Sequence, residues 1–121
     1  MHSNQVIHRD IKSDNILINS AEGTIKLADF GFSCRMLSGQ ELRSSRVGTV
    51  AWMAPELVRG HRLGYDFSID IWSYGILAVE LANGEPPNIR KNNREILQRI
   101  LKDPTPQLDE RWSPMFQDFV N

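Results

Sequence analysis

The sequence predicts a mainly α-helical fold with a small β-hairpin, α+β overall. Two short β-prone runs, Ile16 to Asn19 and Thr24 to Leu27, flank a turn-like Ser-Ala-Glu-Gly segment, and this pattern predicts an antiparallel hairpin. Farther along, a strongly apolar stretch ends at Asn83-Gly84, and an amphipathic stripe covers residues 94–102. Both have the length and spacing of α-helices. We therefore expect one hairpin followed by helices.

A long polar loop is expected between Gly31 and Gly48. Serine, arginine, glutamine and glutamate dominate this segment, which has no hydrophobic periodicity. Loops of this length in a compact domain are usually functional or mobile.

A short helix is expected from Pro55 to about Gly60. Proline in the first turn loses no intrahelical donor, and Glu56 suits the positive end of the helix dipole. The glycine is a typical stop.

The apolar stretch predicts a helix from Ser68 or Asp70 to about Asn83. Its residues are hydrophobic on nearly every face, so we expect this helix to be buried all round. Gly84 and the following Pro86-Pro87 prevent its continuation.

Two shorter helices are expected after it. The first has an apolar stripe over residues 94–102, formed by Ile96, Leu97, Ile100 and Leu101. The second covers residues 113–120, where Ser113 is a good N-cap and Pro114 follows it.

Composition indicates one soluble domain with no general affinity for nucleic acid. Of 121 residues, 40% are hydrophobic and 24% charged, and the 14 Lys and Arg against 15 Asp and Glu give a net charge of -1. The basic residues form only short clusters, which favour solvated faces over a nucleic-acid patch. The single cysteine, Cys34, favours a reducing cytoplasm or nucleus, and no apolar run approaches the roughly 18 residues that span a bilayer.

Three short motifs follow one another along the chain. His8-Arg9-Asp10 opens a segment that runs to Asn15, Asp29-Phe30-Gly31 follows the hairpin, and Ala54-Pro55-Glu56 follows the polar loop. This order resembles the signature set of eukaryotic protein kinases, in which the motifs mark the catalytic loop, the metal-binding loop and the end of the activation segment. The resemblance implies a protein-kinase-like fold, with residues 1–121 as a partial C-terminal lobe and the N-terminal lobe absent.

The residue types in these motifs fit phosphoryl transfer, in which a protein aligns a hydroxyl, holds a metal and neutralises phosphate charge. Asp10 can accept the proton of the attacking hydroxyl, and Lys12, two positions later on an extended segment, can point to the same side, toward the γ-phosphate. Asn15 and Asp29 offer hard oxygen donors for Mg2+ from opposite strand ends of the hairpin. The expected cofactors are ATP and Mg2+.

Each of these residues also has a purely structural interpretation. Singly they suit turns, a solvated surface, a cap or the core; they are Asp10, Asp14, Lys12, Asn15 and Phe30. Their joint spacing is what favours catalysis.

Further residues are assigned by resemblance to the family. Lys12, two positions after the catalytic aspartate, marks a serine/threonine kinase, in which Thr49 bridges Asp10 and Lys12. Leu17 resembles the residue that floors the adenine pocket, although a leucine here equally suits the core of a hairpin.

Two acidic residues resemble structural supports of the family. Asp70 matches the helix aspartate that hydrogen-bonds the backbone of the catalytic loop, and its charge also suits a helix N-terminus. Glu56 matches a residue that pairs with a later arginine, expected beyond Asn121, so here it is expected to lack that partner.

The loop from Asp29 to Glu56 resembles an activation segment. Ser45, four residues before Thr49, matches the usual phosphosite, and Ser44 is the alternative. By resemblance Arg9 is the phosphate partner, since phosphorylation adds about -1.5 to -2 charge that an arginine can bind.

The sequence further resembles the small-GTPase-activated PAK kinases of the sterile-twenty group over essentially its whole length. The matching segments are His2 to Ile7, Asp29 to Phe32, Trp52 to Glu56 and Asn83 to Pro87. Val50-Ala51 replaces the usual Pro-Tyr of the substrate-docking loop. The resemblance implies phosphorylation of serine and threonine in protein substrates during intracellular signalling, and a small GTPase as a partner through a region outside this chain.

The Gly-rich loop, the ATP-anchoring lysine and its glutamate partner would precede Met1. Without them we expect the chain alone to be inactive and the helix around Trp72 to expose apolar patches. The alternative is a non-catalytic fragment of a kinase that acts as a protein-binding module. The intact Asp10 and Asp29 favour the kinase.

Overall fold

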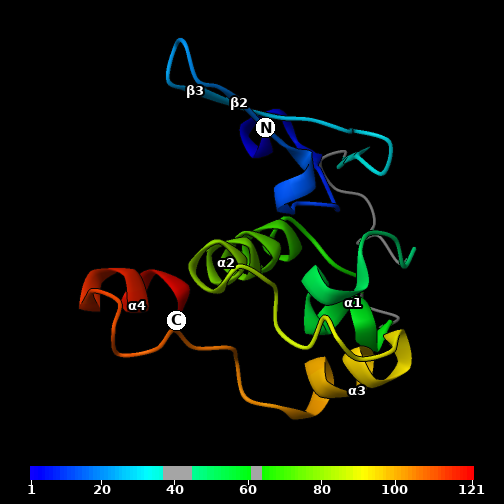
Figure 1. The fold of residues 1–121 in the computed structure, drawn as a ribbon. Coiled ribbons are helices and arrows are strands. Elements are labelled where there is room, and N and C mark those ends of the chain that lie inside the picture. The colour runs from blue at the N-terminus through cyan, green and yellow to red at the C-terminus, as the bar shows by residue number, and fades with distance from the viewer. Residues whose placement is uncertain (37–44, 61–63) are drawn as a thin grey trace.

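The computed structural model describes residues 1–36, 45–60 and 64–121 (Figure 1). The strands are β1 (Val6–Ile7), β2 (Ile16–Asn19), β3 (Thr24–Leu27) and β4 (Cys34–Arg35). The α-helices are α1 (Pro55–Arg59), α2 (Ser68–Asn83), α3 (Asn93–Lys102) and α4 (Pro114–Val120). Three short 3-10 helices are η1 (His2–Asn4), η2 (Ser13–Asn15) and η3 (Val50–Trp52). A mainly helical fold with a small hairpin is confirmed.

The hairpin has the predicted boundaries. β2 and β3 are antiparallel, with Ile16 opposite Leu27 and Asn19 opposite Thr24. The Asn19 side chain accepts hydrogen bonds from the Ala21 and Glu22 amides, which closes the turn. Figure 1 shows the hairpin projecting from the helical part of the molecule. A second antiparallel pair was not predicted: β1, which precedes the hairpin in the chain, pairs with β4, which follows it.

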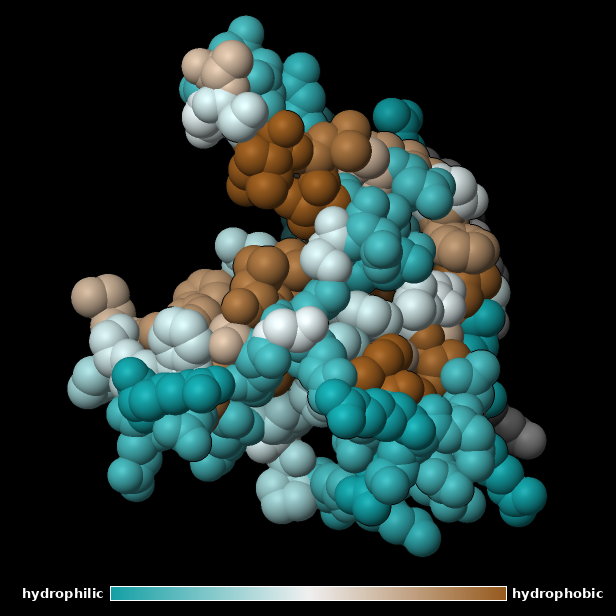
Figure 2. Space-filling view, in the orientation of Figure 1, coloured by the Kyte–Doolittle hydropathy of each residue, from teal (hydrophilic) through white to brown (hydrophobic). Residues whose placement is uncertain are grey.

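Helix α2 lies between α4 on one side and α1 on the other (Figure 1). The expectation that it is buried all round is wrong, because Ile71, Tyr74 and Leu81 are 62%, 51% and 71% exposed. In the described part of the chain η2, η3, α4 and the core residues of α1 and α3 pack against α2, and these elements do not cover its whole circumference. Figure 2 shows hydrophobic surface along this helix and under the hairpin.

The buried core joins the short elements to α2. One cluster consists of Ile7, Met53, Ala54, Leu57, Val58, Tyr65 and Ile69, and a second of Ala51, Trp52, Ile76 and Ile96. Segments on both sides of the polar loop therefore pack together, which fixes the loop ends near the start of α2.

The helix ends follow local capping signals. α1 starts with proline at its first turn and ends at Gly60 with φ 63, where glycine tolerates the left-handed conformation. Asn92 and Ser113 cap α3 and α4 by accepting the Glu95 and Phe116 amides. The predicted boundaries of all four helices are confirmed to within about one or two residues.

Asp66, just before α2, has a carboxyl group with a lowered pKa. The Ser68 amide donates to the Asp66 carboxylate at 2.8 Å and holds the pKa of that carboxyl below its ordinary value.

No helix within residues 1–36, 45–60 and 64–121 is long and apolar enough to cross a membrane.

Candidate active site

Helix α2 anchors the segment between β1 and β2. The Asp70 carboxylate, 1% exposed, accepts the backbone amides of His8 and Arg9 at 2.8 Å each. Its Oδ2 also lies 2.8 Å from Nε2 of His2. Arg9 has φ 70, a conformation that L-residues adopt only when their surroundings hold them there. A buried carboxylate in the helix therefore sets the path of the loop that carries Asp10.

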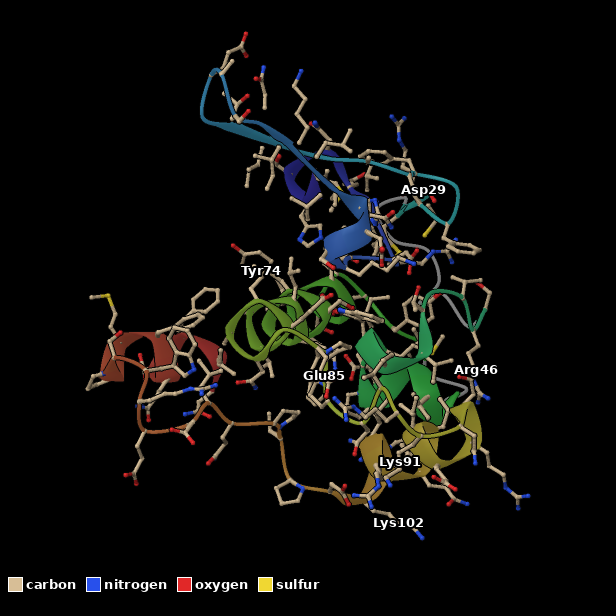
Figure 3. All side chains as sticks on the ribbon, in the orientation of Figure 1. Asp29, Arg46, Tyr74, Glu85, Lys91 and Lys102 are labelled. Atoms are coloured by element: carbon tan, nitrogen blue, oxygen red, sulfur yellow. The ribbon has the colours of Figure 1, made fainter. Side chains whose placement is uncertain are left out.

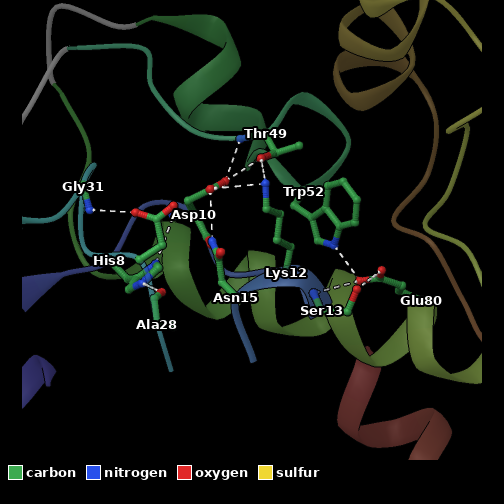
Figure 4. A network of polar contacts seen from close by, with 11 residues as sticks. His8, Asp10, Lys12, Ser13, Asn15, Ala28, Gly31, Thr49, Trp52 and Glu80 are labelled. Carbon is green, nitrogen blue, oxygen red and sulfur yellow. Dashed lines mark hydrogen bonds and ion pairs between the residues drawn. The ribbon is translucent and has the colours of Figure 1, made fainter. Parts of the chain in front are cut away.

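Asp10 is 5% exposed and held from several directions. Its Oδ1 accepts the amide of Thr49 at 2.9 Å and the hydroxyl of Thr49 at 2.6 Å. Lys12 Nζ lies 3.4 Å from the Asp10 Oδ2 and donates to the Thr49 hydroxyl at 2.8 Å. The side-chain Nδ2 of Asn15 donates to the backbone carbonyl of Asp10 at 2.8 Å and to its Oδ2 at 3.2 Å. Figure 4 shows these four side chains converging.

The segment before Thr49 packs directly on the Asp10 loop. Gly48 has φ 107, and a side-chain carbon added to it would lie 2.4 Å from the Arg9 carbonyl oxygen. Only glycine fits both the conformation and the contact. The end of the polar loop is thus held against the residues that precede Asp10.

His8 links the Asp10 segment to the Asp29 segment. It is fully buried, its Nε2 lies 2.9 Å from the Ala28 carbonyl oxygen, and its Nδ1 lies 3.3 Å from the Asp10 amide. These partners fix the tautomer, because the Asp10 amide can only donate, so Nδ1 accepts and Nε2 donates. One ring therefore bridges the two backbone segments that carry the predicted carboxylates.

Asn15 and Asp29 lie at the same end of the hairpin, since one precedes β2 and the other follows β3. The Ala28 amide donates to the Asn15 carbonyl at 2.8 Å and extends the pairing toward Asp29. Asp29 has φ 56, and its Oδ1 accepts the Gly31 amide at 3.1 Å. Figure 3 labels Asp29, which is exposed, beyond the helical part of the molecule.

The donor set at this end of the hairpin fits Mg2+. The Asn15 side-chain nitrogen is committed to Asp10, which leaves its carbonyl oxygen as the group that can bind a cation. The Asp29 carboxylate supplies a second hard oxygen donor. Mg2+ typically takes one or two protein oxygens together with water and phosphate oxygens, and an amide oxygen and a carboxylate are donors of the kind it prefers.

Several purely structural interpretations are wrong. Phe30 is 52% exposed and packs its ring edge to face with His8, so it is not a simple core residue. Leu17 is 57% exposed on β2 and does not form a hairpin core. Lys12 is paired with Asp10 and Thr49 rather than solvated. The site formed by Asp10, Lys12, Asn15 and Asp29 has residue types that could accept a proton, hold a divalent cation and neutralise an anion.

Comparison with known proteins decides the family. The family model described as the protein kinase domain matches residues 1–121, the whole chain. The chain belongs to the protein kinase family. Its partial kinase fold and the order of its three motifs agree with this assignment.

Relatives of this kinase domain include proteins named as PAK kinases. Mouse serine/threonine-protein kinase PAK 1 is 49% identical over 122 residues, which are 99% of this chain and 22% of that protein. Serine/threonine-protein kinase pakC of Dictyostelium discoideum is 49% identical over 123 residues, 100% of this chain and 25% of that protein. Schizosaccharomyces pombe sid1, also named a serine/threonine-protein kinase, is 42% identical over 121 residues, which are 100% of this chain and 25% of that protein. The resemblance to the PAK kinases is confirmed, and the chain spans a quarter or less of these relatives.

The structure describes only part of the predicted activation segment. Ser45 accepts a hydrogen bond from Arg9 Nη1 at 3.0 Å, while Ser44, the alternative phosphosite, lies outside the described residues. The Arg9 Nε also donates to the Phe32 carbonyl at 2.5 Å. At the end of the segment, Glu56 accepts a hydrogen bond from the hydroxyl of Ser68 at 3.1 Å.

The sequence analysis missed Glu80. This α2 carboxylate accepts the backbone amide and the hydroxyl of Ser13 and the indole Nε1 of Trp52, the last at 3.0 Å (Figure 4). It thereby ties the catalytic loop and η3 to one helix position. An acid in the last turn of a largely apolar helix was the available signal, because an acid among apolar neighbours needs donors.

A cavity of about 510 Å3 lies elsewhere, between α2, α4 and the segment at Thr105 and Pro106. Its walls include Ile71 and Phe119 and none of the residues around Asp10. The chemistry of the site therefore does not depend on this cavity.

Proposed function

We propose that this chain is the catalytic half of a protein serine/threonine kinase, which transfers the γ-phosphoryl group of ATP to serine and threonine hydroxyls of protein substrates. The observation that carries the proposal is the fixed cluster of Asp10, Lys12, Asn15 and Thr49, joined through His8 to the segment that bears Asp29. Membership of the family and relatives named serine/threonine-protein kinases support it.

Each residue of the cluster has a distinct role in this proposal. Asp10 accepts the proton of the substrate hydroxyl, because its carboxylate is already oriented by Thr49. Lys12 neutralises charge on the transferred phosphoryl group, 3.4 Å from the acid that it also balances. Asn15 and Asp29 would hold Mg2+, which when bound neutralises phosphate charge. Leu17, exposed on β2, would contact the adenine ring.

The partners and location follow from the same assignment. We expect ATP and protein substrates as the ligands, a cytoplasmic location, and a small GTPase acting through a region outside this chain. The alternative, a non-catalytic protein-binding module, is favoured only by the exposed apolar residues of α2, namely Ile71, Tyr74 and Leu81. The ordered contacts around Asp10 support catalysis instead.

The test compares this chain with a completed domain, meaning the chain joined to an N-terminal kinase lobe from its own coding region or from the mouse relative. The completed domain is expected to phosphorylate serine or threonine in a basic test protein, with transfer that requires Mg2+ and ATP. The chain alone is expected to show negligible transfer, because most of the catalysis comes from positioning groups of both lobes. Labelled phosphate is followed, and phosphoamino acids are identified after hydrolysis. A completed domain that folds but transfers nothing would contradict the proposal.

Replacement of Ser45 with alanine is expected to lower the activity of the completed domain about tenfold or more. Phosphate on Ser45 would gain at least one charge-assisted hydrogen bond from Arg9, roughly 1.5 kcal/mol or more, and the alanine variant cannot form it. Activity is measured after phosphorylation by an upstream kinase. Ser20→Ala, in the exposed hairpin turn, is the control and is expected to keep full activity. If Ser44→Ala reduces activity and Ser45→Ala does not, the alternative phosphosite replaces the first.

A further inference from the structure

We propose that the hydroxyl of Tyr65 is a second ligand for a phosphate carried by Ser45, alongside Arg9. The inference rests on the proposed phosphorylation of Ser45. The Tyr65 oxygen accepts Arg9 Nη1 at 3.0 Å, donates to the Ser45 carbonyl at 2.7 Å and lies 3.4 Å from the Ser45 hydroxyl. Arg9 Nη1 reaches that hydroxyl as well, at 3.0 Å. Arginine, serine and tyrosine thus form a closed triangle around the modification site.

Burial holds the Tyr65 hydroxyl in place. The residue is 4% exposed, and its ring belongs to the core cluster that contains Ile7, Met53 and Ile69. Ser45 itself is exposed, so a modifying enzyme could reach its hydroxyl. A rigid donor beside an accessible serine loses little conformational entropy when it binds an added group.

The single proton of the Tyr65 hydroxyl decides how the site responds. On phosphorylation a bond forms between Ser45 Oγ and the γ-phosphorus of ATP, the bond to the leaving ADP oxygen breaks, and the serine proton passes to the base of the phosphorylating enzyme. The product oxygens lie within reach of Tyr65, because the serine oxygen itself is 3.4 Å away. A phosphate dianion is a stronger acceptor than a neutral carbonyl, so the hydroxyl turns from the Ser45 carbonyl to the phosphate.

The charges around the triangle favour this binding. The Arg9 guanidinium already faces both oxygens, and the adjacent Arg46 lies close by, with its Nη2 on the Val58 carbonyl at 2.7 Å. Asp66 follows Tyr65 in the chain, and its carboxylate faces the Ser68 amide. All three groups remain unchanged when only the phenol oxygen of Tyr65 is removed.

The test uses the whole chain with phosphoserine incorporated at position 45, and the control is built into the sequence, which has two tyrosines. Tyr74 lies on α2 beside Phe119 of α4, away from Arg46 (Figure 3). The phosphorus resonance is titrated with pH in the parent chain, Tyr65→Phe and Tyr74→Phe. Donation by Tyr65 stabilises the dianion, so Tyr65→Phe is expected to move the titration midpoint to higher pH and to speed removal of the phosphate by a phosphatase about tenfold. Tyr74→Phe is expected to change neither quantity.

A second measurement needs no substitution at Tyr65. Tyrosine labelled with carbon-13 at the ring carbon that bears the hydroxyl gives two NMR signals, one for each tyrosine, and the Tyr74→Phe variant assigns them. Phosphorylation of Ser45 is expected to shift the Tyr65 signal alone. An unchanged Tyr65 signal, or the same titration midpoint in Tyr65→Phe and the parent chain, would overturn the inference. Neither readout requires kinase activity. Tyr65→Phe could move the midpoint, and phosphorylation could shift the Tyr65 signal, while phosphoserine at position 45 does not activate the completed domain. In that case the proposed regulation fails and the phosphate site remains.

Discussion

Replacement of Asp10 with asparagine is expected to lower kcat of the completed domain by about 100- to 10,000-fold. The amide retains an oxygen that can accept the amide and hydroxyl of Thr49, and Asn15 still donates to the Asp10 carbonyl, while the contacts of Lys12 and Asn15 with the Oδ2 position are lost. It has no basic carboxylate for the proton of the attacking hydroxyl. The loss therefore falls on kcat, while KM for ATP changes little because the nucleotide groups Lys12, Asn15 and Asp29 are intact. Steady-state kinetics with varied ATP separate the two parameters.

Asp118→Asn is the matched control for this prediction. Asp118 is an exposed acid on α4, far along the chain from the catalytic loop, and its substitution has the same chemistry. We expect its kcat to equal that of the parent domain. A kcat for Asp10→Asn within about twofold of the control would remove Asp10 from the reaction and with it the role proposed for the cluster.

Local signals in the sequence predicted the elements well. Pro55 and Gly60 bound α1, Ser113 caps α4, and the turn after Asn19 closes the hairpin at the predicted residues. These features depend on neighbouring residues within one turn, so the sequence carries them directly. The roles of the site residues come from the family resemblance of three motifs at residues 8–10, 29–31 and 54–56, and they remain predictions.

Long-range contacts could not be predicted from the residues alone. The β1 and β4 strands have two residues each, which is too short for a recognisable pattern. The exposure of one side of α2 depends on which elements happen to pack against it. The Glu80 contacts with Ser13 and Trp52 span 67 and 28 positions. The bridge through His8 joins residues that are separated by the whole hairpin. Each requires the folded arrangement, which no periodicity encodes.

The contacts of Asp70 show how α2 couples stability to catalysis. The carboxylate holds the amides of His8 and Arg9, and the next residue in that loop is Asp10. A change at Asp70 therefore reaches Asp10, the proposed proton acceptor, through two backbone hydrogen bonds, without contact to any substrate. Its effect should appear in the stability of the chain alone as well as in the activity of the completed domain.

Replacement of Asp70 with alanine is expected to lower the free energy of unfolding of the chain by about 3 kcal/mol or more. One buried amide, that of His8, and one part-buried amide, that of Arg9, lose their acceptor, at roughly 1–3 kcal/mol each. Urea denaturation followed by circular dichroism measures the change. In the completed domain, kcat should fall as well, because Arg9, which precedes Asp10, is no longer held in its left-handed conformation.

Asp66→Asn, at the start of the same helix, separates this effect from a general loss of acid near α2. Its carboxylate accepts one exposed amide, that of Ser68, and asparagine accepts that amide equally well. We expect a loss below about 0.5 kcal/mol at neutral pH. Because the pKa of Asp66 is lowered on folding, its small contribution is present above the ordinary value of 3.8 and disappears as pH falls through the folded-state pKa below it. Equal destabilisation by the two substitutions would mean that Asp70 acts only as a helix N-terminal charge, and that the hydrogen bonds to His8 and Arg9 contribute nothing to holding the catalytic loop.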